Sequence, residues 1–194
     1  MWDGILKILK EKAKQGIEIR IIYDDMGSIA MLSQKYPQEL KKYGIKCIPF
    51  NKVSPFKGIF MNNRDHRKIT IIDGKIAFSG GVNISDEYIN INSKYGIWKD
   101  NAIQIEGDAV WNLTTMFLTL WNANTNEDKN ILKYKYNFPL TPKKSGYIVP
   151  YGISPLSKEL IAEDIYINII NSSKKYLYIC LLYTSDAADD LLCV

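Results

Sequence analysis

Apolar residues recur at intervals of three and four along several stretches of the chain, as they do on the buried face of an α-helix. The first stretch begins at Trp2 and ends before Gly16, and glycine commonly follows the last residue of a helix. A later stretch follows Gly107 and places its aromatic residues on one face, where we expect them in the core rather than around a ligand. The pattern predicts helices over residues 2–15, 37–43, 107–121 and 157–172.

Shorter runs rich in β-branched and apolar residues predict β-strands. Asp73-Gly74 separates two of these runs and is a strong signal for a β-hairpin. The order strand, helix, strand in the first part of the chain predicts an α/β fold built in layers. The predicted strands cover residues 17–23, 45–49, 66–72, 75–79, 102–105 and 176–179.

The segments between these elements are rich in polar residues, glycine and proline. We expect loops over residues 50–62 and 86–101, and a linker over residues 122–146. After the linker, residues 157–179 read as a helix followed by an apolar strand, which repeats the arrangement of residues 2–23. The repetition suggests that a second, similar domain begins there.

Composition is that of a globular protein. The chain has 194 residues, of which 46% are hydrophobic and 24% are charged, and it is long enough to bury a core. No stretch approaches the roughly 20 apolar residues of a membrane-spanning helix. The formal net charge of +4 fits an anionic partner such as phospholipid headgroups or nucleic acid. The three cysteines have no metal-ligand spacing and favour a reducing compartment.

Both ends of the sequence are unlike the ends of a complete domain. Residues 180–194 follow the last predicted strand without a turn signal, and their first residues can be encoded by the transposon-end adapter of sequencing libraries. We therefore expect residues 180–194 to be a non-native tail, and without its three aspartates the net charge of +4 becomes +7. The first helix has no capping residue and no strand before it, so we expect a fragment that begins at an internal methionine.

His66 is the one histidine of the chain, and Lys68 follows it two residues later. On a strand, residues two apart face the same way, so the imidazole and the ammonium group should lie side by side. A neutral imidazole is nucleophilic near neutral pH, and an ammonium group can hold a non-bridging phosphate oxygen. The pair therefore suits attack on a phosphodiester.

The predicted hairpin brings further candidate residues to the same place. Gly80 and Gly81 allow close approach of the backbone, and the Asn83 amide can donate to the phosphate in a five-coordinate transition state. Asp73 at the turn completes the candidate catalytic set, and we expect it to fix geometry rather than to react. A lone histidine is more often structural than catalytic, but the whole string H-x-K-x4-D-x6-G-G-x-N favours the catalytic interpretation.

This string resembles the hallmark of the phospholipase D superfamily, H-x-K-x4-D-x6-G-[GS]-x-N. The resemblance covers residues 1–179 and is greatest to clostridial-type bacterial cardiolipin synthases, for example in Asn63–Ile69, Gly80–Ile84 and Trp98–Asp100. It implies a phospholipase D-like α/β/α sandwich. The implied organisation is a first half without its first strand at 1–140, a linker and the start of a second half at 141–179, and the tail at 180–194.

In this family two halves, each with one H-x-K-x4-D motif, form one active site that needs no metal or other cofactor. By resemblance, His66 would take a phosphatidyl group from one phosphatidylglycerol as a phosphohistidine and pass it to a second, giving cardiolipin and glycerol. The resemblance also implies anionic phospholipid, a membrane surface and a second catalytic half as partners. It implies a parent protein at the cell membrane with a cytoplasmic-side catalytic domain. The implied site is catalytic His66, Lys68 and Asp73, with Asn83, Gly80 and Gly81 binding phosphate.

Three functions are compatible with the sequence. The chain can be an inactive fragment of a cardiolipin synthase, because a second histidine to act as general acid is absent from it. It can be a phosphodiesterase, such as a nuclease, that completes its single motif as a homodimer, since a positive charge suits DNA. The missing first strand and the beginning of a second half make nucleic acid the less favoured partner. The third possibility is a binding domain without catalysis.

Overall fold

The computed structural model describes residues 1–53, 64–92, 96–139, 147–153 and 159–179. The chain divides into two compact units between Pro150 and Tyr151. The predicted tail at 180–194 and most of the predicted loop at 50–62 lie outside the described residues.

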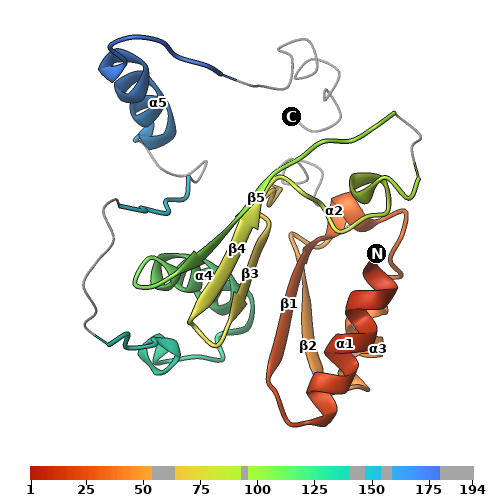
Figure 1. The fold of residues 1–194 in the computed structure, drawn as a ribbon. Coiled ribbons are helices and arrows are strands. Elements are labelled where there is room, and N and C mark those ends of the chain that lie inside the picture. The colour runs from red at the N-terminus through yellow and green to blue at the C-terminus, as the bar shows by residue number, and fades with distance from the viewer. Residues whose placement is uncertain (54–63, 93–95, 140–146, 154–158, 180–194) are drawn as a thin grey trace. The chain divides into compact units, whose positions relative to one another are not determined.

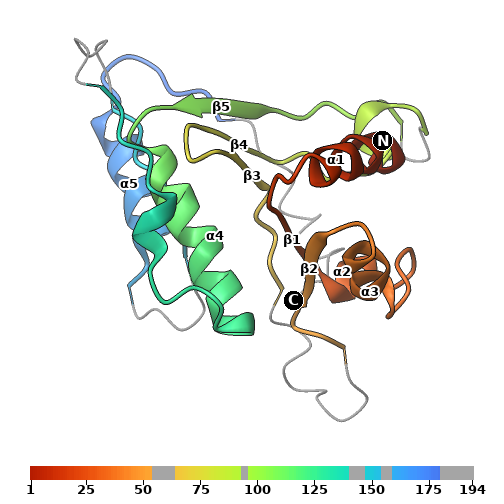
Figure 2. The ribbon, with the colours of Figure 1, turned by 90° about the horizontal axis from the view of Figure 1, so that it is seen from below.

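The first part of unit 1 alternates helices with two parallel strands (Figure 1). Helices α1 and α3 both pack against β2 and lie on the β2 side of the strand pair (Figures 1 and 2). The pairing register sets Ile19 opposite Ile45. The elements are α1 (Trp2–Lys14), β1 (Ile19–Asp24), α2 (Asp25–Ser28), α3 (Tyr36–Lys41) and β2 (Ile45–Phe50).

Helix α1 ends where the sequence predicts. Gly16 has a φ of +83°, its N–H donates to the carbonyl of Ala13 (3.0 Å), and the N–H of Ile17 donates to the carbonyl of Lys12 (3.2 Å). These two backward hydrogen bonds around a left-handed glycine are a Schellman motif. The motif turns the chain directly into β1.

The second part of unit 1 is an antiparallel sheet with a helix across one face (Figure 2). The sheet order is β3, β4, β5, and α4 packs against β3 and β4. The elements are β3 (Ile69–Ile72), β4 (Ile76–Gly80), the 3-10 helix η2 (Glu87–Ile89), β5 (Ala102–Glu106), α4 (Val110–Thr125) and the 3-10 helix η3 (Ile131–Tyr134).

The core lies in two places within unit 1. Four residues pack between the antiparallel sheet and α4, namely Ala77, Ile105, Val110 and Leu113. Leu40 of α3 and Ile45 of β2 are both 1% exposed and form the other buried site. The predicted burial of the aromatic face of α4 is confirmed at Trp121, which is also 1% exposed.

The mixed α/β architecture is confirmed, but two segments of unit 1 differ from the prediction. The strand predicted at 66–72 begins only at Ile69, so the segment before it, 64–68, lies outside the strand ladder. The predicted linker at 122–146 is partly folded, since α4 continues to Thr125 and η3 follows. The reason is a long-range contact, because Asp128 forms an ion pair with Arg20 of β1.

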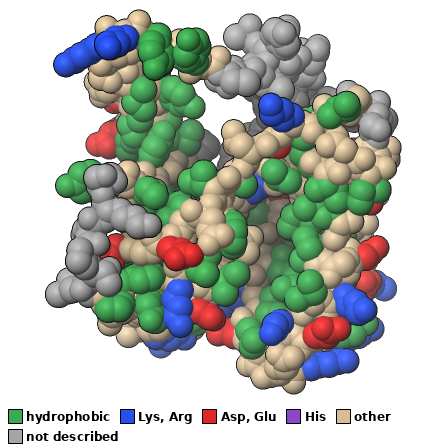
Figure 3. Space-filling view, viewed as in Figure 1, with side chains coloured by type: hydrophobic (Ala, Val, Ile, Leu, Met, Phe, Trp, Pro, Cys, Tyr) green, Lys and Arg blue, Asp and Glu red, His purple; other side chains and the backbone are tan. Residues whose placement is uncertain are grey.

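Unit 2 contains helix α5 (Ile161–Ser172), which buries none of its residues. Hydrophobic side chains of this unit lie at the surface in the space-filling view (Figure 3). The strand predicted at 176–179 is wrong: these residues pair with no strand in the part of the chain that the structure describes. An apolar run forms a strand only where a neighbour accepts its backbone hydrogen bonds. Among the described residues, no helix is long and apolar enough to cross a membrane.

Candidate active site

The hairpin of β3 and β4 turns at Asp73 and Gly74. Their φ angles are +54° and +66°, and the N–H of Lys75 donates to the carbonyl of Ile72 (2.9 Å). Positive φ at both central residues is the requirement of a type I′ turn, which explains the Asp-Gly sequence. The predicted hairpin is therefore confirmed, with Asp73 at its tip.

The other end of this hairpin brings the rest of the motif together. Ile69 is paired with Ser79, so Lys68 and Gly80, the next residues outward on each strand, reach the same end of the sheet. His66 precedes Lys68 there and Asn83 follows Gly80. At the roughly 3.3 Å per residue of an extended strand, the length of β3 separates this group from Asp73.

His66 is exposed, and Lys68 is half-buried beside it. The Lys68 ammonium group donates to the carbonyl oxygen of His66 (2.6 Å). Burial lowers the pKa of Lys68, and the carboxylates of Asp65 and Asp100 act in the opposite direction. The lysine is thus held over the backbone of the histidine in a partly desolvated and charged environment.

The two glycines are close to the chain that enters β5. A Cβ on Gly80 would meet the carbonyl of Asn101 and lie 2.6 Å from the Cα of Ala102. A Cβ on Gly81 would meet the carboxylate of Asp100, 3.0 Å from its Cγ. The absence of side chains therefore admits residues 100–102 and places the Asp100 carboxylate next to the motif.

Trp98 connects the loop after β4 to Asp100. Its backbone N–H donates to the side-chain oxygen of Asn90 (2.6 Å), and the Asn90 amide donates back to the Trp98 carbonyl (2.9 Å). The indole packs edge-on against Tyr88, with ring centroids 4.6 Å apart, and donates to the Asp100 carboxylate (3.2 Å). Asn83, at the start of this loop, is half-buried, and its carbonyl accepts from the N–H of Ser85 (2.9 Å).

An ion pair anchors the segment before His66. Both Nε and Nη2 of Arg64 donate to Oδ2 of Asp24, at 2.9 and 2.8 Å, and the N–H of Gly27 donates to the same oxygen (2.9 Å). Asp24 is the last residue of β1, so the pair joins the parallel strands to the motif. Neither this pair nor Asp100 is among the site residues predicted from the sequence. The available signals were an aspartate at the end of a strand and an arginine two residues before the histidine.

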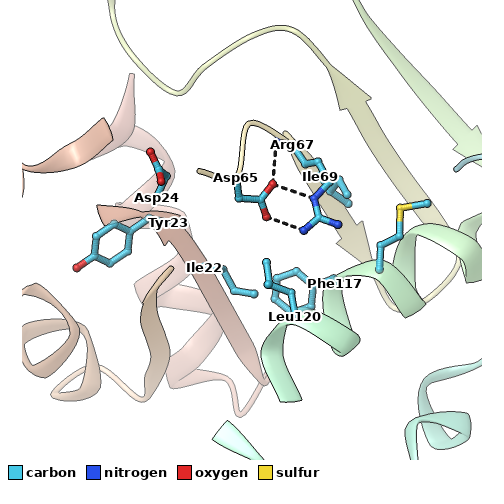
Figure 4. A pocket seen from close by; sticks show the side chains of 9 residues that line it. Ile22, Tyr23, Asp24, Asp65, Arg67, Ile69, Phe117 and Leu120 are labelled. Carbon is cyan, nitrogen blue, oxygen red and sulfur yellow. Dashed lines mark hydrogen bonds and ion pairs between the residues drawn. The ribbon is translucent and has the colours of Figure 1, made fainter. Parts of the chain in front are cut away.

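A small cavity of about 90 Å³ lies beneath the motif (Figure 4). Asp65 and Arg67 line it and form their own ion pair, with hydrogen bonds of 2.8 Å, while Phe117 and Leu120 line it from α4 (Figure 4). Burial raises the pKa of Asp65, but hydrogen bonds from Arg67 outweigh it and hold that pKa below its usual range. His66 and Lys68 do not line this cavity, so it is not the place where the motif would meet a substrate.

The arrangement offers groups whose chemistry suits a phosphate. They are the exposed imidazole of His66, the ammonium group of Lys68 bonded to the carbonyl of that histidine, and the Asn83 amide in the loop after β4. Fixed hydrogen-bond donors and cations of this kind can stabilise the charge that develops on a phosphate in a transition state.

Comparison with known proteins identifies the family. The family model described as "cardiolipin synthase, PLD-like domain" matches residues 3–121, which include every predicted site residue. A cardiolipin synthase of Halalkalibacterium halodurans is 38% identical over 182 residues, covering 92% of this chain and 36% of that protein. A cardiolipin synthase of Geobacillus kaustophilus is 36% identical over 180 residues, covering 91% of this chain and 35% of that protein.

A further relative, an uncharacterized protein of Streptococcus mutans, is 43% identical over 183 residues, which cover 94% of this chain and 40% of that protein. The chain therefore spans 35–40% of the length of these three relatives. With a family match over more than half of its length, the chain belongs to the cardiolipin synthase family of phospholipase D-like domains.

Proposed function

We propose that this chain supplies the nucleophilic half of a phosphatidyltransferase site, with His66 as the nucleophile and phosphatidylglycerol as the substrate. The observation that supports this most is that residues 66–68 and residues 80–83 adjoin the β3–β4 hairpin at the same end of its strands. The family match adds that two relatives with 36–38% identity to this chain are named cardiolipin synthases.

The proposed reaction has two displacement steps at phosphorus. First, a ring nitrogen of His66 bonds to the phosphorus of one phosphatidylglycerol, and the bond from phosphorus to the headgroup glycerol oxygen breaks. Glycerol leaves with a proton, and the phosphatidyl group stays on His66 as a phosphohistidine. Second, a glycerol hydroxyl of another phosphatidylglycerol loses its proton and bonds to phosphorus, and the nitrogen–phosphorus bond breaks. The products are glycerol and cardiolipin.

The other motif residues would handle the charge of the phosphate. Lys68 would hold a non-bridging oxygen, and Asp65 and Asp100 favour its charged form despite its burial. The Asn83 amide would donate to the same phosphate, while Gly80 and Gly81 keep the space around it free of side chains. Asp73 would act indirectly by holding the turn.

The protons must be given and taken by a group outside this chain. The sequence contains one histidine, and the proposal uses it as the nucleophile. We assign the general acid and base to a second catalytic half, as in the two-motif organisation that the resemblance implies. The chain alone would then carry out at most the first step, and only where the leaving group needs no proton.

This requirement gives a direct test with a phosphatidyl p-nitrophenyl ester, whose leaving group departs as an anion. The chain should release a burst of p-nitrophenolate near one per molecule and accumulate a phosphohistidine, visible by ³¹P NMR. His66→Ala should abolish the burst, and Lys68→Met should slow it about 100-fold. With phosphatidylglycerol, the same sample should make no cardiolipin.

Three outcomes would contradict the proposal. If the His66→Ala variant still gives a burst, His66 is not the nucleophile. If the folded wild-type chain gives no burst, the chain does not carry out the first step. Continuous turnover by a species that elutes as a dimer would instead support the homodimeric phosphodiesterase.

We also propose that the site works at a membrane surface containing anionic phospholipid, at the cytoplasmic side of the membrane in the parent protein. The loop that Trp98 ties to Asp100 exposes several isoleucines, with Ile91 68% and Ile97 92% exposed. Ile91→Ser with Ile97→Ser should reduce sedimentation of the chain with phosphatidylglycerol vesicles. Ile8 on α1 is 57% exposed, so Ile8→Ser is the control variant, and it should leave sedimentation with the vesicles unchanged. Equal effects of the two changes would rule out a specific role for this loop.

A further inference from the structure

Residues 64–68 carry the reactive side chains but lie outside the ladder of β3. Strand pairing therefore does not fix His66 and Lys68 directly, although a phosphate-binding group needs a fixed geometry to be effective. The contacts of this segment with the rest of unit 1 decide where the two side chains stand.

The strongest of these contacts is the ion pair of Arg64 with Asp24. Two guanidinium N–H groups reach one carboxylate oxygen at 2.8 and 2.9 Å, and the two side chains are only 16% and 14% exposed. An ion pair so far removed from water is costly to break, because the remaining partner is left charged without compensation. It links residues forty positions apart, at the end of β1 and at the start of the motif segment.

Helix α2, which follows β1, leaves room for the guanidinium group at Gly27. A Cβ on Gly27 would lie 2.6 Å from Nη2 of Arg64 and 2.7 Å from Oδ2 of Asp24. Any side chain at this position would therefore displace at least one of the two charged groups. Gly27→Ala offers a way to disturb the pair without changing either of its members.

The ion pair lies beside the cavity beneath the motif, because Asp24 is one of the residues that line this cavity. Asp65, Arg67 and Ile69 line the cavity beneath the motif, whereas His66 and Lys68 do not. Arg64 precedes His66 by two residues and Lys68 by four, so the ion pair fixes the segment close to both reactive side chains.

We propose that the Asp24–Arg64 ion pair is a positioning device that holds His66 and Lys68 in the geometry that binds phosphate. In this role the pair acts on the phosphate through the segment that carries His66 and Lys68, which it fixes to the end of β1. This inference rests on the proposed function, since it assumes that His66 and Lys68 receive a phosphate.

The single histidine makes the test specific, because its ring protons give one set of NMR signals. Inorganic phosphate is titrated into the full chain, and the shift of the His66 signals gives the phosphate concentration at half-saturation. Arg64→Gln, Asp24→Asn and Gly27→Ala should each raise that concentration about tenfold, because misplacement of a fixed group by about 1 Å is enough to weaken its contacts severely. Arg64→Lys keeps the positive charge but loses one of the two hydrogen bonds to Asp24. Its half-saturating phosphate concentration should lie between those of the wild type and Arg64→Gln.

Arg20→Gln is the matched control, since it removes another buried, long-range ion pair of β1 that lies away from the motif. It should lower the melting temperature at least as much as Arg64→Gln and change the half-saturating phosphate concentration less than about twofold. If Arg20→Gln weakens phosphate binding as much as the Arg64 change, the pair is merely structural and the inference is wrong.

Unchanged phosphate binding in folded Gly27→Ala and Asp24→Asn would also overturn it. If the His66 signals of the wild-type chain do not shift when phosphate is added, the proposed phosphate site is wrong. The role assigned to the ion pair is then wrong as well. A result in which the wild type responds and the variants do not differ from it would remove the positioning role alone.

Discussion

Gly80 and Gly81 are neighbours in the sequence, but a side chain at each position would meet different atoms. A side chain on Gly80 would collide with the backbone of Asn101 and Ala102, which cannot move without opening β4 from β5. A side chain on Gly81 would meet only the end of the Asp100 side chain, which can rotate away. The two positions therefore have different tolerance for the same methyl group.

We expect Gly80→Ala to lower the free energy of unfolding by about 2–3 kcal/mol, as overpacking of a fixed backbone does. Gly81→Ala should cost less than about 1 kcal/mol but should release Asp100 from the motif. Gly4→Ala in α1, where nothing lies within 4 Å, is the control and should add up to about 1 kcal/mol. Urea unfolding followed by circular dichroism gives all three values, and a Gly81 variant as unstable as the Gly80 variant would contradict this explanation.

At the scale of residues, the sequence predicts site residues that belong to a local motif. It does not predict residues whose role depends on a contact with a distant part of the chain. His66, Lys68 and Asn83 could be selected because their types and spacing form a known string. Asp24 and Arg64 could not be paired in advance, because forty residues separate them and no local pattern connects them. Asp100 was likewise hidden, since its proximity depends on the missing side chain of Gly81.

At the scale of elements, one buried cluster joins β1 to the segment after α4. The Arg20 guanidinium forms an ion pair with Asp128 and donates to the Tyr134 hydroxyl (2.6 Å), and it lies 5.1 Å from the Trp121 ring centre. The side chains of Arg20 and Asp128 are 8% and 3% exposed. This cluster, rather than any helix or strand propensity, folds residues 126–134 back onto the sheet.

Arg20→Met should therefore lower the free energy of unfolding by about 3 kcal/mol, because the buried Asp128 carboxylate loses its buried partner and keeps the exposed Lys133. Lys46→Met on the neighbouring strand is the control. Its ion pairs with Glu18 and Glu127 are about half exposed, so its loss should cost less than about 1 kcal/mol. Similar melting temperatures for the two variants would show that burial of the pair does not govern its contribution.

The same cluster predicts a pH dependence. The hydrogen bond from Arg20 holds the pKa of Asp128 well below its usual range, and contacts with Lys133 and Tyr134 add to this. A carboxyl whose pKa is lower in the folded state stabilises the fold above its unfolded pKa of about 3.9, and this stabilisation is lost as the pH falls through the folded pKa.

The difference in unfolding free energy between the wild type and Asp128→Asn should accordingly be constant from pH 7 to about pH 5 and shrink below about pH 4. Urea titrations of both proteins between pH 7 and pH 3 measure it. A difference that grows on acidification would mean that the carboxyl is not charged in the folded chain.

Elements were predictable where a local rule decides them. Gly16 ends α1 and the Asp73-Gly74 turn forms the hairpin because both need only a backbone conformation that glycine or aspartate tolerates. The strand at 176–179 and the linker at 122–146 were misjudged because distant residues decide them. The first has no pairing partner among the described residues, and Asp128 tethers the second.

At the scale of the whole molecule, the two units differ in burial. Leu113, Leu118 and Trp121 of α4 are buried in unit 1, whereas α5 of unit 2 buries nothing. An isolated helix of the length of α5 is only marginally stable in water. Its apolar residues at the surface are consistent with a partner half that the proposed function requires.

Hydrogen exchange should show this difference directly. Amides in α5 should exchange within about tenfold of the rate of an unfolded peptide, while those in the middle of α4 should exchange only upon unfolding of unit 1. Protection of α5 equal to that of α4 would mean that unit 2 is stabilised by contacts beyond those described.

The hairpin also gives the spacing of the motif a physical meaning. Four residues separate Lys68 from Asp73 because they are the strand β3, and the six between Asp73 and Gly80 complete the turn and most of β4. The spacing within the motif is therefore set by the lengths of the two strands of the hairpin and of the turn between them. One inserted residue in either arm would turn every later side chain to the opposite face. Two residues added to each arm would keep Lys68 beside Gly80 and move only Asp73 outward, so length changes here should be tolerated only in compensated pairs.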